Sequence, residues 1–139
     1  MRDERLSRFA LTSRDVETRA AQHHLKPVRL MPRRHAATGR LEVSVCRSGQ
    51  LSPDAVWAIC AKHLDPHVPK PAVGRGVGPG GAVADAGLGL DCNGVPYAEH
   101  ADVVGWHEVP GVPDDQLKSF WKATAQQIAP AFSYVPRPD

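Results

Sequence analysis

A histidine, an indole and two carboxylates alternate along one short segment of this chain. Within 98–109, His100, Asp102, Trp106 and Glu108 occupy even positions, and Ala, Val and Gly fill most of the odd ones. Such alternation is typical of a strand with one buried and one solvated face. Side chains two residues apart lie on the same face of a strand, so we expect these four to project together.

These residue types predict two kinds of chemistry. An imidazole titrates near neutral pH, so His100 is a candidate general acid or base. A His-x-Asp pair also offers mixed nitrogen and oxygen ligands to a divalent ion, with Glu108 or Asp85 as a third. His100, Asp102 and Glu108 are therefore the candidate catalytic residues of a small metal-assisted hydrolase or transferase. This is the alternative hypothesis, because a solvated strand face carries polar residues even without such a function. The sequence indicates no cofactor and designates no metal site.

Trp106 has two interpretations that the sequence leaves open. On a solvated face, its indole would be an anchor for a partner or a stacked ligand. A bulge at Gly105 would shift the alternation by one residue and place Trp106 in the core instead.

The charge of the chain is unevenly distributed. Residues 1–40 contain ten Arg and Lys residues against four acidic ones, whereas residues 41–139 contain seven against eleven. A basic segment of this kind favours contact with an acidic surface or a polyanion. Nucleic-acid binding is a further alternative, limited to phosphate contacts because no aromatic residues interleave with the arginines. The candidate binding residues are Trp106, Arg29, Arg33, Arg34, Arg40 and Arg47.

Several familiar motifs are excluded. The glycines of 76–81 match GxGxxG as text, but we expect a strand after them rather than the helix that a dinucleotide site needs. Cys60, His63 and His67 have only a loose resemblance to zinc-ligand spacing. GxSxG, CxxC and P-loop motifs are absent, and Ser44 or Cys46 would be a nucleophile only if His100 lay on an adjacent strand.

Hydrophobic spacing and capping residues predict the elements that position these side chains. Ser52 followed by proline and an acid marks a helix start, and LEVSVCR shows the clearest strand alternation in the chain. We expect helices over 12–26, 53–64 and 114–129, strands over 28–31, 41–47, 82–92 and 98–109, and a Gly- and Pro-rich loop over 66–81.

Together these elements predict an α+β fold: a two-layer sandwich with a small, mostly antiparallel sheet and two main helices on one face. We expect a basic N-terminal segment with one short helix (1–40), an α+β core domain (41–129) and a C-terminal tail (130–139). No apolar run is long enough to span a membrane, and no secretory signal is visible. We therefore expect a small cytoplasmic binding or interaction protein. It would be an accessory subunit that meets a protein partner or a second copy of itself through its polar sheet face and basic segment.

Overall fold

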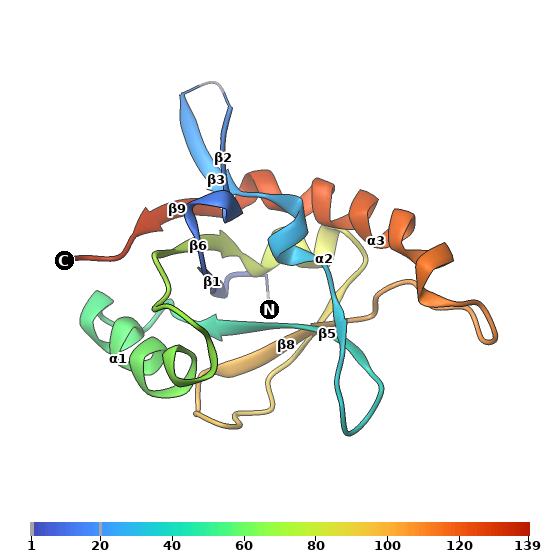
Figure 1. The fold of residues 1–139 in the computed structure, drawn as a ribbon, viewed down its shortest axis with the longest axis horizontal. Helices are drawn as coiled ribbons and strands as arrows, with labels where there is room; N and C mark the ends of the chain where they lie inside the picture. The colour runs from blue at the N-terminus through green and yellow to red at the C-terminus, as the bar shows by residue number, and fades with distance from the viewer. Residues whose placement is uncertain (1, 20) are drawn as a thin grey trace.

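The computed structural model describes residues 2–19 and 21–139, and a single sheet runs through this part of the chain (Figure 1). Its strands are hydrogen-bonded in the order β2-β3-β9-β6-β1-β5-β8-β7, with β4 paired to β5, and each pairing is antiparallel. The α+β class, the antiparallel sheet and the two main helices are confirmed. The strands are β1 (Arg5–Ala10), β2 (Val16–Arg19), β3 (Gln22–Leu25), β4 (Arg33–Arg34), β5 (Leu41–Arg47), β6 (Gly74–Pro79), β7 (Gly89–Asp91), β8 (His100–Val104) and β9 (Ser133–Pro136), and the helices are α1 (Pro53–His63), α2 (Gly80–Asp85) and α3 (Asp114–Ile128). Short 3-10 turns lie at Ser13–Asp15, Pro27–Leu30, Asp65–His67 and Ala129–Ala131.

Strand β5 and helices α1 and α3 form where local sequence signals predict them. The Ser52 hydroxyl accepts a hydrogen bond from the Ala55 amide at 3.2 Å, so it caps α1 as expected. Helix α3 begins with acids that favour a helix N-terminus, and it ends at Ile128, before Pro130.

The two main helices lie on opposite faces of the sheet, although the sequence predicts both on one face. Helix α3 packs in the larger core cluster with Leu41, Val43 and Val45 of β5. Helix α1 packs in a second cluster that includes Cys46, whose side chain points to the other face of β5. Figure 1 shows the two helices on different sides of the strands. Each helix covers only part of one face, which leaves room for polar groups beside α1.

The N-terminal segment is part of the sheet rather than an appendage to it. Strand β1 lies between β5 and β6 in the interior of the sheet. The helix predicted over 12–26 is replaced by a 3-10 turn and the β2–β3 hairpin. Thr12 and Asp15 form a capping box at the start of this segment, but the residues that follow pair as strands. Ala20, within the predicted helix, lies outside the described residues. The strand predicted over 28–31 is also wrong, because Pro27 starts a 3-10 turn there.

The region predicted as a loop over 66–81 contains strand β6, which pairs with β1 and β9. Its glycines make room for side chains packed over it. A Cβ on Gly76 would overlap the Leu25 side chain, and one on Gly78 would lie 2.9 Å from the Phe132 ring. The segment 82–92, predicted as a strand, is divided between α2 and the short strand β7, and the tail contributes β9.

None of the helices in residues 2–19 and 21–139 combines the length and the apolar character needed to cross a bilayer.

Replacing Gly76 by Ala should destabilise the fold by about 1–3 kcal/mol, because the new methyl group would overlap the fully buried Leu25 side chain. Urea unfolding followed by circular dichroism measures this change. The matched control is Gly89→Ala, where the nearest atom to the new methyl group is 3.7 Å away. Equal stability of the two variants would contradict the packing argument.

Candidate functional site

The candidate site lies where β1 and β5 separate. Their ladder contains only the pairs Leu6–Arg47 and Ser7–Cys46. Beyond Ser7, the next side chain of β1 reaches across to β5. Nη1 of Arg8 donates to the Ser44 carbonyl at 2.9 Å, and its Nε donates to the Arg29 carbonyl at 3.1 Å. The guanidinium therefore supplies a donor to the Ser44 carbonyl, which a continuing β1–β5 pairing would otherwise satisfy, and a second donor to a carbonyl of the 3-10 turn at Pro27–Leu30.

Arg29 makes a similar contact from the opposite direction. Its Nε donates to the Phe9 carbonyl at 2.7 Å, and the same nitrogen lies 3.9 Å from the Asp15 carboxylate. Burial, followed by repulsion from Arg29 and Arg33, lowers the pKa of Arg8, and burial also lowers the pKa of Arg29. An arginine stays protonated in proteins, so these shifts mean that the two positive charges are held at an energetic cost.

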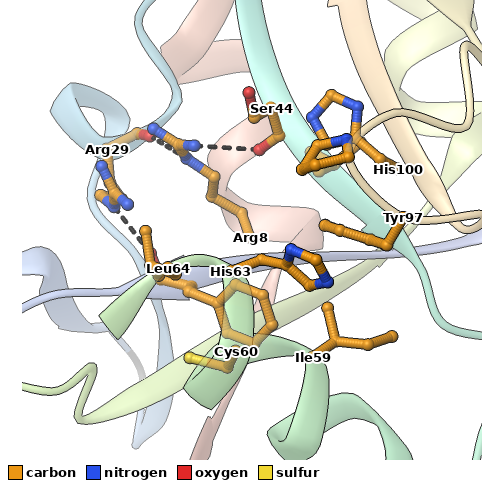
Figure 2. Close-up of a pocket in the computed structure, with 12 residues that line it drawn as sticks. Arg8, Arg29, Ser44, Ile59, Cys60, His63, Leu64, Tyr97 and His100 are labelled. Atoms are coloured by element: carbon orange, nitrogen blue, oxygen red, sulfur yellow. Dashed lines mark hydrogen bonds between the residues drawn. The ribbon is translucent and has the colours of Figure 1, made fainter. Parts of the chain in front are cut away.

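Beside these arginines is a hollow of about 210 Å³ between β5 and α1. Figure 2 shows Arg8 and Arg29 on one side of it and Tyr97 and His100 on the other, with α1 side chains below. The imidazole of His63 lies 5.0 Å from the Tyr97 ring, and Tyr97 meets His100 edge-on at 5.4 Å. Two larger and more open hollows adjoin this one, and Ser44 lines all three.

His100 and Asp102 lie together, as the strand alternation predicts. Register pairs His100 with Cys46 and Asp102 with Ser44 on β5. The Asp102 carboxylate is 4% exposed and accepts three hydrogen bonds. The donors are Ser44 Oγ at 3.2 Å, Asn93 Nδ2 at 2.7 Å and Arg40 Nη2 at 3.4 Å.

This network also determines which ring nitrogen of neutral His100 carries the proton. The Asn93 amide nitrogen donates to Asp102, so Oδ1 of Asn93 must accept the 2.7 Å hydrogen bond from Nδ1 of His100. In the neutral ring, Nδ1 therefore carries the proton and Nε2 carries the lone pair. Nε2 lies 3.7 Å from the Asp102 carboxylate, which is too far for a hydrogen bond. Burial lowers the pKa of His100, although Asp102 opposes the shift.

The acidic side chains around Asp102 surround an arginine of the protein itself. Arg40 donates to Glu42 at 3.0 and 3.1 Å and to Asp91 at 2.8 Å, in addition to Asp102. Its guanidinium holds the position that a divalent ion would need among these carboxylates. Within the described residues, no group of three or more His, Cys, Asp and Glu side chains is arranged to hold a metal ion.

Trp106 and Glu108 do not lie with His100 and Asp102. Gly105 has a φ of +90° and ends β8, so the alternation stops there. Trp106 is 5% exposed and packs in the larger core cluster together with residues of α3. Its Nε1 donates to the Val103 carbonyl at 3.0 Å. The interpretation of Trp106 as an exposed anchor is therefore wrong. Glu108 instead contacts Arg34 at 2.6 Å.

Most of the arginines proposed as binding residues already have partners in the structure. Arg34 pairs with Asp114 at 2.7 Å as well as with Glu108. Arg47 donates to the Ala98 carbonyl at 3.0 Å and lies 3.7 Å from Glu4. Arg33 is exposed on β4, where its backbone pairs with Glu42.

Sequence reasoning missed Arg8, His63, Asn93 and Tyr97. A signal for Arg8 was present, because it falls between two apolar residues, Leu6 and Ala10, that share its strand parity. A charge at such a position has either a buried partner or a functional reason. No local pattern marks the other three, which come from α1 and the β7–β8 connection.

Lowering the pH from about 7.5 to about 5 should destabilise the wild-type protein through His100. Its pKa in the folded state is below the ordinary 6.5, so the unfolded chain binds the proton more readily in this range, and stability falls as the pH falls. The free energy of unfolding of His100→Gln should decrease less over the same range, as measured by urea titrations. His67→Gln, at an exposed turn, is the control for loss of a histidine. An unchanged pH dependence in His100→Gln would refute the assignment.

Comparisons of this chain with family models, with curated proteins and with solved structures find no match. Function must therefore be inferred from the side chains that form the site.

Proposed function

We propose that this protein is a ligand-binding protein that takes the anionic group of a small molecule in the hollow between β1, β5 and α1. One observation carries the proposal: the Arg8 guanidinium is held by two carbonyls, and no ion pair to it occurs within residues 2–19 and 21–139. Arg8 is partly buried, and a cation withdrawn from water without a carboxylate in contact with it is costly. An anionic ligand would remove that cost, and Nη2 of Arg8 makes no hydrogen bond to the described residues.

The wider distribution of charge supports a small ligand rather than a polyanion. Arg34 and Arg40 each contact two or more acidic side chains, so their charges are already compensated. Binding along a nucleic-acid backbone requires a series of cations that can each displace counter-ions. Arg8, which has no ion pair within the described residues, lies instead at the edge of a concave hollow, which is the usual shape of a small-molecule site.

The state of the nearby hydroxyl and thiol supports binding rather than nucleophilic catalysis. The Ser44 hydroxyl donates a hydrogen bond to the Asp102 carboxylate, so His100 does not activate this hydroxyl. Burial raises the pKa of Cys46 to about 11, so this thiol is protonated near neutral pH and is a weak nucleophile. The sequence predicts binding of a protein partner or a second copy of the chain, whereas this proposal is binding of a small ligand at a different site.

Replacing Arg8 by Gln should weaken anion binding by roughly tenfold or more, because a charge-assisted hydrogen bond contributes about 1.5–3 kcal/mol. Isothermal titration calorimetry with acetate, inorganic phosphate and benzoate, each added separately, measures this change. Arg14→Gln, at the exposed turn before β2, is the control that removes a charge away from the hollow.

We expect at least one of these anions to bind wild type and Arg14→Gln saturably with the same affinity. Amide NMR shifts of the wild-type protein provide a second readout that does not depend on the folding of a variant. They should change at Arg8, Arg29 and Ser44. Failure of all three anions to bind, or shifts confined to another surface, would overturn the proposal.

A further inference from the structure

The hollow beside Arg8 has two chemically different ends. Arg8, Arg29 and Ser44 line one end, and apolar and aromatic groups from α1 and from the β7–β8 connection line the other. Figure 2 shows this division, with the guanidinium groups on one side and Tyr97 and His63 across the space from them. A ligand that fills the hollow must therefore carry its charge at one end only.

The hydrogen-bonding capacity left at the charged end suits a carboxylate. Nε and Nη1 of Arg8 and Nε of Arg29 already donate to backbone carbonyls. Neither arginine retains its Nε edge for a side-on paired contact with an anion, so only terminal N–H groups are left to bind one. Single terminal N–H groups from two arginines match the two oxygens of one carboxylate.

The local charge supports the same choice. Asp15 lies 3.9 Å from Arg29 and partly compensates it. Arg8 and Arg29 are the two arginines that line this hollow, and together with Asp15 they carry a single net positive charge, whereas Arg33 lines the more open neighbouring hollow. A monoanion balances that charge, whereas a phosphate dianion would leave a negative charge in a partly buried place.

The other end of the hollow fits a flat ring. The Tyr97 ring, with His63 at 5.0 Å and His100 at 5.4 Å, makes an aromatic wall. Ile59 and Leu64 add aliphatic groups from α1. Aromatic rings pair with one another beyond what their buried area alone provides. The volume of about 210 Å³ equals that of roughly seven water molecules, which leaves room for one ring with a short substituent.

We infer that the ligand is a small aromatic monocarboxylate, with its carboxylate on Arg8 and Arg29 and its single ring against Tyr97 and His63. This inference rests on the proposed function, and it specifies the chemical class of the ligand.

The test compares four probes by calorimetry on the full chain: benzoate, cyclohexanecarboxylate, phenyl phosphate and methyl benzoate. Benzoate should bind at least tenfold more tightly than each of the others, because only benzoate combines a monoanion with a flat ring. Tyr97→Leu should weaken benzoate binding about threefold to tenfold and leave the affinity for cyclohexanecarboxylate within about twofold. Phe120→Leu, which changes an exposed ring on α3 away from the hollow, is the matched control and should bind benzoate like the wild type.

The outcomes separate this inference from the proposed function. If phenyl phosphate or cyclohexanecarboxylate binds as tightly as benzoate, and Arg8→Gln weakens that binding, the inference fails and the proposed function remains. If Tyr97→Leu and Phe120→Leu affect benzoate binding equally, the ring placement is wrong. If Arg8→Gln leaves every probe unaffected, both proposals fail. Nuclear Overhauser contacts between benzoate protons and the Tyr97 ring provide a test on the wild-type protein, and their absence at saturation would also overturn the inference.

Discussion

The organisation of this protein depends on one guanidinium group that replaces a strand pairing. The β1–β5 ladder ends after two residue pairs, and the Arg8 side chain then donates to Ser44 of β5 and to Arg29. These contacts satisfy backbone carbonyls that would otherwise lack partners in a partly buried place. The same group leaves a positive charge beside a hollow, so a structural requirement and the proposed binding function depend on one residue.

Two polar clusters lie on this side of the sheet, and they differ in how completely they are satisfied. Asp102 has three hydrogen-bond donors, and Arg40 is surrounded by carboxylates. The charged groups of this cluster are partners of one another, and Arg40 links Glu42 of β5, Asp91 of β7 and Asp102 of β8. At Arg8 the donors meet only carbonyls. The contrast places the unmet electrostatic demand at the hollow rather than at the predicted His100–Asp102 pair.

The placement of the helices explains why the hollow exists. Helix α3 covers the apolar face of β5, whereas α1 covers the other face only near Cys46 and Phe9. The uncovered part of that face is where the polar network and the hollow lie. The glycines of β6 contribute indirectly, because they let Leu25 and Phe132 pack closely over the strand. Strand β6 pairs with β1 on one side and with the C-terminal strand β9 on the other.

Local sequence determined the elements whose signals lie within a few residues of one another. Alternation predicted β5, capping residues predicted α1 and α3, and the two-residue period placed His100 beside Asp102. Tertiary structure decided everything that depends on distant partners. Whether 74–79 became a strand depended on neighbours from both ends of the chain, and the turn at Gly105 ended the alternation that would have brought Glu108 to the site. The environment of Arg8 depended on where two strands separate, which no local pattern records, because the free energy of a buried charge is set by atoms far away in the sequence.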